Sequence, residues 1–478
     1  MKKTVVAFDF GASSGRAIAG TYQDGRLEYK EVHRFDNIPV DNDGRMCHNF
    51  PAICKEVDAA LSKISSADGL SFDTWGVDYG LLDKSGNLLR LPCHYRDTRT
   101  AGTVEKVLKK IPADNLYRAT GNQIMEINTL FQLTTEDTAG AEKLLFMPDL
   151  FAHHLCGSMQ TEPTIASTSQ LLDPINQTWR TDIAKACGID PQLLPAVGPS
   201  ATVLGKTDGG IQVIATAGHD TQCAVAAMPA AAGEQPAFLS CGTWSLIGCE
   251  LDEPILTPDS RADDLSNEQG ANGKINYLKN ISGLWLIQET RRAYRRAGAE
   301  YSYNDLEQLA RAAEPFTCFI DPDDPRFAIP GDLPERIRDF CRETGQPVPE
   351  SVGAVVRCIY ESLAMKYRFV LDQISARTVG VDADMGALGQ LLHLLGGGTK
   401  DGFLCQMTAD SLAFPVIAGP TEATALGNML LQLIALDQLP DVAAGRELIR
   451  KTETLKTYEP KPTAARDRAY RDFQNILR

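Results

Sequence analysis

Short apolar runs that end in glycine or turn residues recur along the whole chain, and each is typical of a strand. Segments with apolar residues at helical spacing lie between them, so strand and helix patterns are interspersed, which predicts an α/β protein. The run after the Asp24-Gly25 turn is expected to return as the second arm of a hairpin. The clearest strands are predicted at residues 4–10, 27–35, 212–217, 237–239 and 391–395.

The clearest helix is predicted over residues 352–374. Its apolar side is formed by Val352, Val355, Ile359, Leu363, Val370 and Ile374. The charged residues Arg357, Glu361, Lys366 and Arg368 are expected to face water. A different pattern, small residues bracketed by Pro229 and Pro236, suits a linker and predicts a domain boundary.

Composition places the chain among globular proteins. Its 478 residues are 43% apolar and 23% charged, and this length favours two or three domains. The net charge of −15 repels polyanions, so we expect neither nucleic acid nor an anionic membrane as a partner. A small anionic ligand in a locally positive pocket remains compatible with this charge.

The twelve cysteines form no C-x-x-C pair and have no zinc-type spacing with histidine, so no metal site is predicted. They are interpreted as reduced, mostly buried thiols of a cytoplasmic protein, and spacing leaves open whether Cys341 and Cys358 pair. No leader and no stretch of membrane-spanning length is evident in the sequence.

The loop after the first strand carries a dense group of small residues. Gly11 and Gly15 flank 12–14, and Arg16 follows, a pattern that lets backbone N–H groups and a fixed positive charge approach phosphate oxygens. The alternative is an ordinary hairpin turn. A third interpretation reads G-x-S-x-G as a nucleophile elbow around Ser13. The segment 17–22 opposes it, because an elbow should lead into a helix and this segment predicts a strand.

Two further stretches combine strand ends with polar chemistry. The carboxylate of Asp220, in the segment 218–221 after a predicted strand, could accept a proton from a substrate hydroxyl as a general base. Without other context, the local pattern favours the alternative, in which Asp220 or Thr221 caps the apolar segment that follows and His219 is structural. The segment 73–78 offers a ring face and acids for a sugar, or else a core strand with Trp75 buried and a bulge at the glycine.

Two weaker signals complete the candidates. The apolar run 281–287 suggests a helix start, with Asn280 near its beginning and Gln288 two turns on, and no spacing rule makes either residue catalytic. The glycines 396–398 follow a predicted strand and can bring backbone close to a ligand, although they lack the Rossmann spacing.

Taken together, these segments resemble the FGGY carbohydrate kinases over nearly the whole chain. The matching segments, in order, are DFGASSGR (9–16), DTWGVD (73–78), LLD (81–83), YRDTRT (95–100), NTL (128–130), QL (132–133), MPD (147–149), HDT (219–221), GTWSL (242–246), LKNI (278–281), GLWL (283–286), GGG (396–398) and EATALGN (422–428). The form of residues 12–16 is similar to that of family members that phosphorylate L-rhamnulose.

The resemblance implies two actin-like, ribonuclease H-type α/β domains with an interdomain cleft. They are expected at residues 1–228 and 236–440, with a helical extension at 441–478 that packs back on the N-terminal domain. The implied reaction is ATP-dependent phosphorylation of the O1 hydroxyl of L-rhamnulose, with Mg²⁺ arriving with ATP and Asp9 as an outer-sphere partner. Asp220 would be the catalytic base.

The remaining roles are also implied by the resemblance. The sugar would be held by Gly76, His219, Asp220, Thr221 and Asn280. The nucleotide and its phosphates would be held by Ala12, Ser13, Ser14, Gly15, Arg16, Thr243, Gln288 and Gly397.

Some residues depart from the family pattern. His48-Asn49 stands where relatives usually carry Trp-Asp, and Cys241 and Gln222 replace small residues. These changes keep other ketoses, such as L-fuculose or xylulose, open as substrates. An alternative from another class is an actin-fold ATPase without a sugar substrate. The protein is expected to be a monomer or a small homo-oligomer.

Overall fold

The structure is a computed structural model that describes residues 2–11, 14–379, 390–461 and 463–477. The chain divides into two compact units: unit 1 contains Met1–Ala232, Glu250–Tyr277 and Glu422–Glu453, and unit 2 contains Gly233–Cys249, Leu278–Thr421 and Thr454–Arg478. The three-part division expected from the sequence stays a prediction. In the described part of the chain, no helix is long and apolar enough to cross a membrane.

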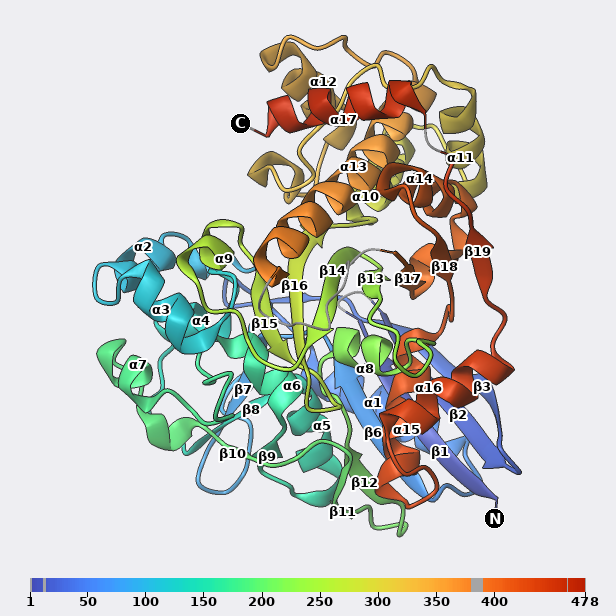
Figure 1. The fold of residues 1–478 in the computed structure, drawn as a ribbon. Coiled ribbons are helices and arrows are strands. Elements are labelled where there is room, and N and C mark those ends of the chain that lie inside the picture. The colour runs from blue at the N-terminus through green and yellow to red at the C-terminus, as the bar shows by residue number, and fades with distance from the viewer. Residues whose placement is uncertain (1, 12–13, 380–389, 462, 478) are drawn as a thin grey trace. The chain divides into compact units, whose positions relative to one another are not determined.

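Unit 1 is built on a six-stranded sheet in the order β11-β12-β6-β1-β2-β3 (Figure 1). Its strands are β1 (Lys3–Phe10), β2 (Ser14–Gln23), β3 (Arg26–Asp36), β6 (Gly69–Thr74), β11 (Thr202–Lys206) and β12 (Gln212–Ala215). β1 and β12 both run parallel to β6, whereas β1 and β2 form an antiparallel hairpin. The carboxyl ends of β1, β6 and β12 therefore lie at one edge of the sheet.

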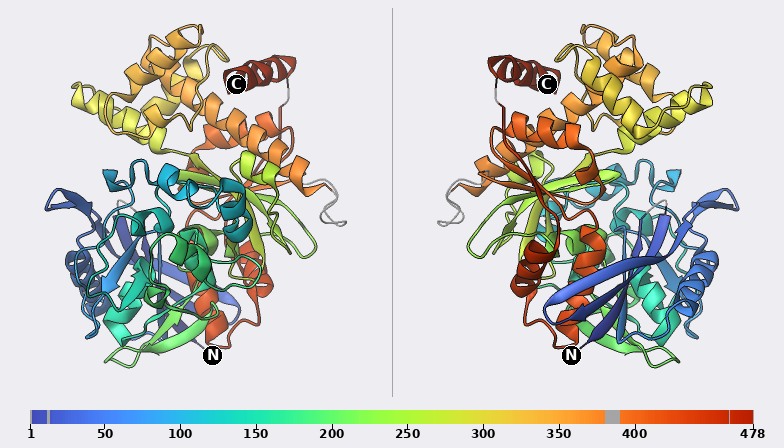
Figure 2. Two further views of the ribbon diagram at one scale, coloured as in Figure 1. Left: turned by 90° about the vertical axis from the view of Figure 1, so that its left-hand side faces the viewer. Right: turned by 90° about the vertical axis from the view of Figure 1, so that its right-hand side faces the viewer.

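The side chains of β1 point alternately to the two faces of this sheet, and each face packs against its own hydrophobic core. Val6, Phe8 and Phe10 pack with α1 (Phe50–Ser62) and α5 (Met147–Cys156). Val5 and Ala7 pack on the opposite side with α15 (Ala423–Ala435) and α16 (Val442–Thr452). Figure 2 shows these last two helices, in orange and red, against the blue strands.

The second sheet has the order β15-β16-β14-β13-β17-β18-β19. Its strands are β13 (Ala237–Cys241), β14 (Trp244–Leu251), β15 (Ser266–Gln269), β16 (Ile275–Ser282), β17 (Leu392–Leu395), β18 (Val416–Ala418) and β19 (Lys456–Tyr458). The helices of unit 2 are α10 (Trp285–Arg296), α11 (Tyr303–Ala312), α12 (Leu333–Glu343), α13 (Val352–Thr378), α14 (Gly402–Leu412) and α17 (Ala464–Ile476).

Shorter elements complete unit 1. Its two-stranded sheets pair β4 (Val40–Asn42) with β5 (Arg45–Cys47), β7 (Tyr79–Leu82) with β8 (Lys143–Phe146), and β9 (Gln160–Thr161) with β10 (Ala196–Val197). Its other helices are α2 (Thr103–Leu108), α3 (Ala113–Thr120), α4 (Thr129–Leu133), α6 (Pro163–Ala166), α7 (Thr181–Ala186), α8 (Asp220–Ala226) and α9 (Pro258–Ala262).

The structure confirms the five predicted strands and the long helix, with ends that differ by a few residues. The prediction that Glu361 and Lys366 of α13 face water is wrong, because both are buried. α13 is packed against other helices on several sides, so these charges are paired inside. Glu361 lies 2.8 Å from Arg357, and Lys366 lies 2.7 Å from Asp321.

Candidate functional site

Three carboxylates of unit 1 come from the shared edge of the six-stranded sheet. Asp9 lies near the end of β1, and its register partner on β6 is Asp73. Asp220 is the first residue of α8, which follows β12 after a short connection. A bridge between Thr74 and His219 continues the parallel pairing up to the start of that helix. The topology thus gathers acids at the strand ends, where α/β proteins usually bind ligands.

β1 and β2 form an antiparallel hairpin that closes at Gly11 and Ser14. Asp9 pairs with Arg16 and Phe10 with Gly15, and the Gly11 N–H donates to the Ser14 carbonyl at 2.8 Å. The nucleophile elbow is wrong, because the first strand leads into a second strand and not into a helix. A Cβ at Gly15 would overlap the Phe35 ring, so a larger residue there would require that side chain to move. Ala12 and Ser13 lie outside the described residues.

Arg16 is the cation of this loop, and two carboxylates hold it. Its guanidinium donates to Asp9 and, at 2.5 Å, to Glu422, which immediately precedes α15. Burial lowers the pKa of Arg16, but Asp9 and Glu422 raise it above its ordinary value overall. The side chain is therefore charged and held in place, and a phosphate group would share it with two acids. Glu422 was named only within the family resemblance, without a role.

Asp220 is half-buried, with about 33% of its side chain exposed. Its Oδ1 accepts a hydrogen bond from the Thr221 N–H at 2.6 Å, and the residue before it, His219, occupies the N-cap position. The surrounding protein removes water and raises the pKa of the Asp220 carboxyl to about 6; His219 opposes this change and Asp9 adds to it. Such a carboxylate is reachable and is mostly ionised at neutral pH, as a general base requires.

The predicted sugar residues beside Asp220 lie on a buried polar network. His219 Nε2 is 3.5 Å from Asp220 Oδ1, and Nδ1 is 3.1 Å from Glu268 Oε2 on β15. Gln222 Nε2 donates to the same Glu268 oxygen at 2.7 Å. Glu268 was missed in the sequence analysis, because nothing in its local sequence links it to a histidine 49 positions earlier. Gln222, noted there only as a departure, has a defined role in this network.

Asp73 differs from its neighbours at the strand ends. It is fully buried, and Asn428 Nδ2 of α15 donates to its Oδ2 at 2.6 Å. Burial first, and the negative charge of Asp9 next, raise the pKa of Asp73 well above its usual range. Its surroundings thus favour the protonated form, and we assign Asp73 to the framework beneath the other two acids.

In the rest of the segment 73–78, Trp75 and Asp78 lie in the interior of unit 1, as the structural alternative predicted for the tryptophan. Trp75 is buried, and its Nε1 donates to Asp78 at 2.9 Å. Asp78 also accepts from His48 Nε2 at 2.7 Å and from Gln132 Nε2 at 3.0 Å. These contacts use the side chains of Trp75, Asp78 and His48 inside unit 1. Gly76 packs on Thr168, which a Cβ would meet at 3.0 Å.

The predicted nucleotide residues lie in unit 2 on three elements. Thr243 is in the β13–β14 turn, and its carbonyl accepts from the Trp285 N–H at 3.1 Å, which ties that turn to the start of α10. Gln288 is half-buried on α10. Gly397 begins the 3-10 turn η5 (Gly397–Lys400) after β17, and the space where a Cβ would project is open.

The prediction that Asn280 lies near the start of a helix is wrong. The helix in this region starts at Trp285, and Asn280 lies on strand β16. The apolar run 281–287 crosses a strand end and a helix start, so its local pattern was misread as the start of one helix. The side chain of Asn280 is half-buried.

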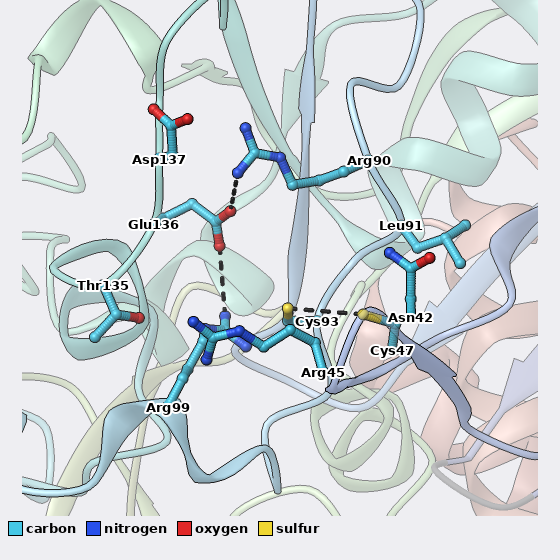
Figure 3. Close-up of a pocket in the computed structure, with 10 residues that line it drawn as sticks. All are labelled: Asn42, Arg45, Cys47, Arg90, Leu91, Cys93, Arg99, Thr135, Glu136 and Asp137. Atoms are coloured by element: carbon cyan, nitrogen blue, oxygen red, sulfur yellow. Dashed lines mark hydrogen bonds and ion pairs between the residues drawn. The ribbon is translucent and has the colours of Figure 1, made fainter.

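A cavity of about 170 Å³ lies elsewhere in unit 1 (Figure 3). In Figure 3, Glu136 lies between Arg90 and Arg99, and the Cys47 and Cys93 thiols face each other. The two sulfur atoms are 3.8 Å apart. None of the predicted site residues lines it. The full lining is Asn42, Arg45, Cys47, Arg90, Leu91, Cys93, Arg99, Thr135, Glu136 and Asp137.

Two groups of buried side chains have donors close enough to share a metal ion. They are Cys318 with Cys341 and Cys358 in unit 2, and His48 with Asp78 and His94 in unit 1. All twelve cysteines are free thiols in the structure, including Cys341 and Cys358. In the second group, burial lowers the pKa of His94 to about 4, and Asp78 already accepts several hydrogen bonds. Its geometry is that of a structural network.

Comparison with known proteins gives a family for both parts of the chain. Residues 4–228 match the N-terminal domain, and residues 237–436 the C-terminal domain, of the FGGY family of carbohydrate kinases. A curated rhamnulokinase of Bacteroides thetaiotaomicron is 41% identical over 497 aligned positions, covering 100% of both chains. A rhamnulokinase of Enterococcus faecalis is 37% identical and covers 96% of this chain and 95% of its own.

Solved structures give the same fold. The gluconate kinase of Lactobacillus acidophilus aligns with a TM-score of 0.78 at 15% identity, over 100% of this chain and 96% of its own. The xylulose kinase of the same organism aligns with a TM-score of 0.76 at 16% identity, over 99% and 96%. The α/β actin-like, two-domain fold expected from the sequence is confirmed. The chain belongs to the FGGY family of carbohydrate kinases.

Proposed function

We propose that this protein transfers the γ-phosphoryl group of ATP to the O1 hydroxyl of L-rhamnulose, forming L-rhamnulose 1-phosphate, with Asp220 as the general base. The observation that carries the proposal is the Asp220 carboxylate: it is partly exposed, it has a pKa of about 6, and it lies in unit 1 with the Asp9–Arg16 hairpin. The substrate is argued from the rhamnulokinases that this chain resembles over its whole length.

The chemistry needs one proton acceptor and charge stabilisation. Asp220 accepts the proton of the sugar hydroxyl as the oxygen bonds to the γ-phosphorus, and the bond from that phosphorus to the bridging oxygen of ADP breaks. His219, Thr221, Gly76 and Asn280 are the proposed sugar contacts. Residues 12–16 are proposed for the phosphates, and Thr243, Gln288 and Gly397 for the rest of the nucleotide.

Mg²⁺ is part of this proposal as the ion that arrives with ATP. Asp9 raises the pKa values of both Asp73 and Asp220, so negative charge is concentrated at this edge of the sheet and a cation would be favoured there. Because Asp9 already accepts from Arg16, its proposed contact with the ion is through water. When bound, the ion would supply positive charge at the phosphates.

One experiment tests the reaction and the base together. ADP release is measured with L-rhamnulose, L-fuculose, xylulose and no sugar, each with and without Mg²⁺, for the wild type and Asp220→Asn. We expect the highest kcat/KM with L-rhamnulose, because each mispaired hydroxyl penalises the wrong ketose. Asp220→Asn should reduce transfer by at least about 100-fold, the lower range for a general base, while ATP still binds.

Other results of this experiment would contradict specific parts of the proposal. Near-normal turnover of Asp220→Asn would remove the base assignment. Preference for another ketose would replace the substrate and keep the kinase. ATP hydrolysis indifferent to every sugar would favour the actin-fold ATPase, an alternative that family membership disfavours. The monomer or small homo-oligomer stays a prediction.

A further inference from the structure

Glu268 lies behind the proposed site as a buried carboxylate with a defined charge partner. It is 4% exposed, on β15, and its Oε2 is 3.1 Å from His219 Nδ1. A buried carboxylate without a countercharge is strongly unfavourable. Glu268 faces the His219 ring, and its presence raises the pKa of that ring.

Glu268 is held in place by amides from two other elements. Gln222 of α8 donates to Glu268 through Nε2 at 2.7 Å, and Asn276 Nδ2 of β16 donates to Gln222 Oε1. Since Gln222 lies on the same helix as Asp220, the network joins the carboxylate to the helix that begins with the base. Amide groups of this kind orient their partners and hold no titratable proton.

The geometry places the His219 ring between two carboxylates. Nδ1 faces Glu268, and Nε2 is 3.5 Å from Asp220 Oδ1. A carboxylate beside one ring nitrogen favours the protonated ring and orients it. With Nδ1 facing Glu268 at 3.1 Å, Nε2 and the charge of the protonated ring stay beside Asp220.

The charges around this pair come from several elements. Burial lowers the pKa of His219, but Glu268, Asp220 and Glu162, which precedes α6, raise it overall. Glu162 itself accepts the Gly218 and Ile165 N–H groups, each at 2.9 Å. On the other side, Asp9 of β1 raises the pKa of Asp220 and the positive His219 lowers it. His219 is thus the positive neighbour that opposes the acids around the base.

On the basis of the proposed function, we propose that Glu268 is a positioning residue for the Asp220 base: it holds His219 protonated and turned toward Asp220, so that Asp220 stays ionised at neutral pH. Glu268 itself does not contact the sugar or the phosphates in this role. The role was invisible in the sequence and is separate from the sugar and nucleotide contacts proposed above.

The test compares Glu268→Gln with Glu268→Asp, and uses Glu250→Gln as a matched control. Glu250 pairs with Arg446 at 2.8 Å in the same unit, so the control also removes a partly buried carboxylate from an ion pair. Loss of the charge at 268 lets His219 become neutral, and the pKa of Asp220 then rises. We expect the acid limb of kcat/KM for L-rhamnulose to move up by about one pH unit in Glu268→Gln.

The expected activity changes follow from that shift. Glu268→Gln should lose about fivefold in kcat/KM at pH 6 and little at pH 8, because a shift of about one pH unit from a pKa of about 6 lowers the ionised fraction of Asp220 from about one half to about one eleventh at pH 6. Glu268→Asp, which keeps the charge, should restore much of the wild-type profile, and Glu250→Gln should leave the limb in place. Equal losses at every pH would mean a purely structural role and would overturn the proposal.

A second measurement makes the inference independent of the substrate. NMR titration of the His219 ring and of the ¹³C-labelled aspartate carboxyls is carried out on the full chain without ligands. In Glu268→Gln, the midpoint of His219 should fall and that of Asp220 should rise. If no ketose is phosphorylated, the proposed function fails while these midpoints still decide the charge coupling. Unchanged midpoints would overturn the inference even in an active kinase.

If Glu268→Gln does not fold, two other variants provide the test. Glu268→Asp would then be compared with Gln222→Leu, which removes the amide that anchors the carboxylate. We expect Gln222→Leu to shift the acid limb in the same direction and by less. A limb at the wild-type position in Gln222→Leu would contradict the proposal, whereas Glu268→Asp is expected to stay close to that position.

Discussion

Two aspartates five residues apart in one segment have pKa values shifted in opposite directions. Asp78 is buried and accepts from His48, Trp75 and Gln132. Burial raises its pKa, but His48, His94 and Gln132 lower it overall. Asp73 is equally buried; burial first and the charge of Asp9 next raise its pKa, and the hydrogen bond from Asn428 and the charge of Arg16 oppose this change. The pKa of each aspartate therefore depends on its own neighbours, and the segment 73–78 is not a single set of sugar-binding acids.

These shifts predict opposite effects of the same substitution on the free energy of unfolding. Asp78→Asn removes the charge that several donors share and should cost roughly 3–5 kcal/mol. Asp73→Asn resembles the protonated form and should gain up to about 1.4 kcal/mol per pH unit relative to the wild type above pH 4. The sign follows because native Asp73 keeps its proton while the unfolded state releases it, so wild-type stability falls as pH rises. Denaturant unfolding from pH 5 to pH 8 measures both; a pH-independent difference for Asp73→Asn would show that Asp73 is ionised.

The sequence was informative about single residues only where the chemistry is local. Asp220 and Arg16 were predicted as site residues because each lies at a recognisable strand end or turn. Glu422 is 406 residues from Arg16, and no local pattern connects it to the hairpin. Glu268 likewise meets His219 only after β15 and α8 are in place. Long-range charge pairs of this kind depend on the topology, which the hydrophobic pattern does not specify.

Element boundaries could be predicted from the sequence where a single hydrophobic periodicity begins and ends with a single helix or strand. The strand at 391–395 and the helix from 352 fit this rule and are confirmed. The region around Asn280 does not fit, because a single apolar run covers the end of β16 and the start of α10. On α13 the pattern was right about the helix and wrong about Glu361 and Lys366, because neighbouring helices cover the charged side as well.

α15 packs closely against α8, the helix that begins with the proposed base Asp220. A Cβ on Gly427 of α15 would overlap the carbonyl of Cys223 on α8, with the carbonyl carbon 2.5 Å away. We therefore expect Gly427→Ala to push α8, and with it Asp220, away from its position. The loss should be about 1–3 kcal/mol of stability and up to about 100-fold in kcat.

Gly445→Ala on α16 is the matched control for this prediction. Its new Cβ would meet only side-chain carbons of Leu430, the nearest at 3.0 Å, and these can move. Stability and kcat should therefore change little. Thermal unfolding and steady-state kinetics of the two variants provide the comparison, and equal effects at both glycines would show that the close approach to α8 does not control the position of Asp220.

At the scale of the whole molecule, the proposed ligand residues divide between the two units. The proposed base and most proposed sugar contacts are in unit 1, around residues 218–226, whereas Thr243, Gln288 and Gly397 are in unit 2. A bound ligand stabilises the states in which its contacts are formed, and amides at those contacts then open less often. Each ligand should therefore leave its own pattern of hydrogen exchange.

We expect L-rhamnulose alone to slow exchange in α8, and a non-hydrolysable ATP analogue alone to slow exchange in α10 and η5. Ligands at about 100 times their Kd should stabilise the binding-competent state by about 2.7 kcal/mol, so protection should reach up to about 100-fold where exchange requires release of the ligand. Hydrogen exchange with mass spectrometry resolves these peptides, and a sugar that is not phosphorylated serves as the control. Protection of α10 by the sugar with none in α8 would contradict the assignment of the sugar to Asp220, because the helix that begins with the base must respond to the substrate whose proton it accepts.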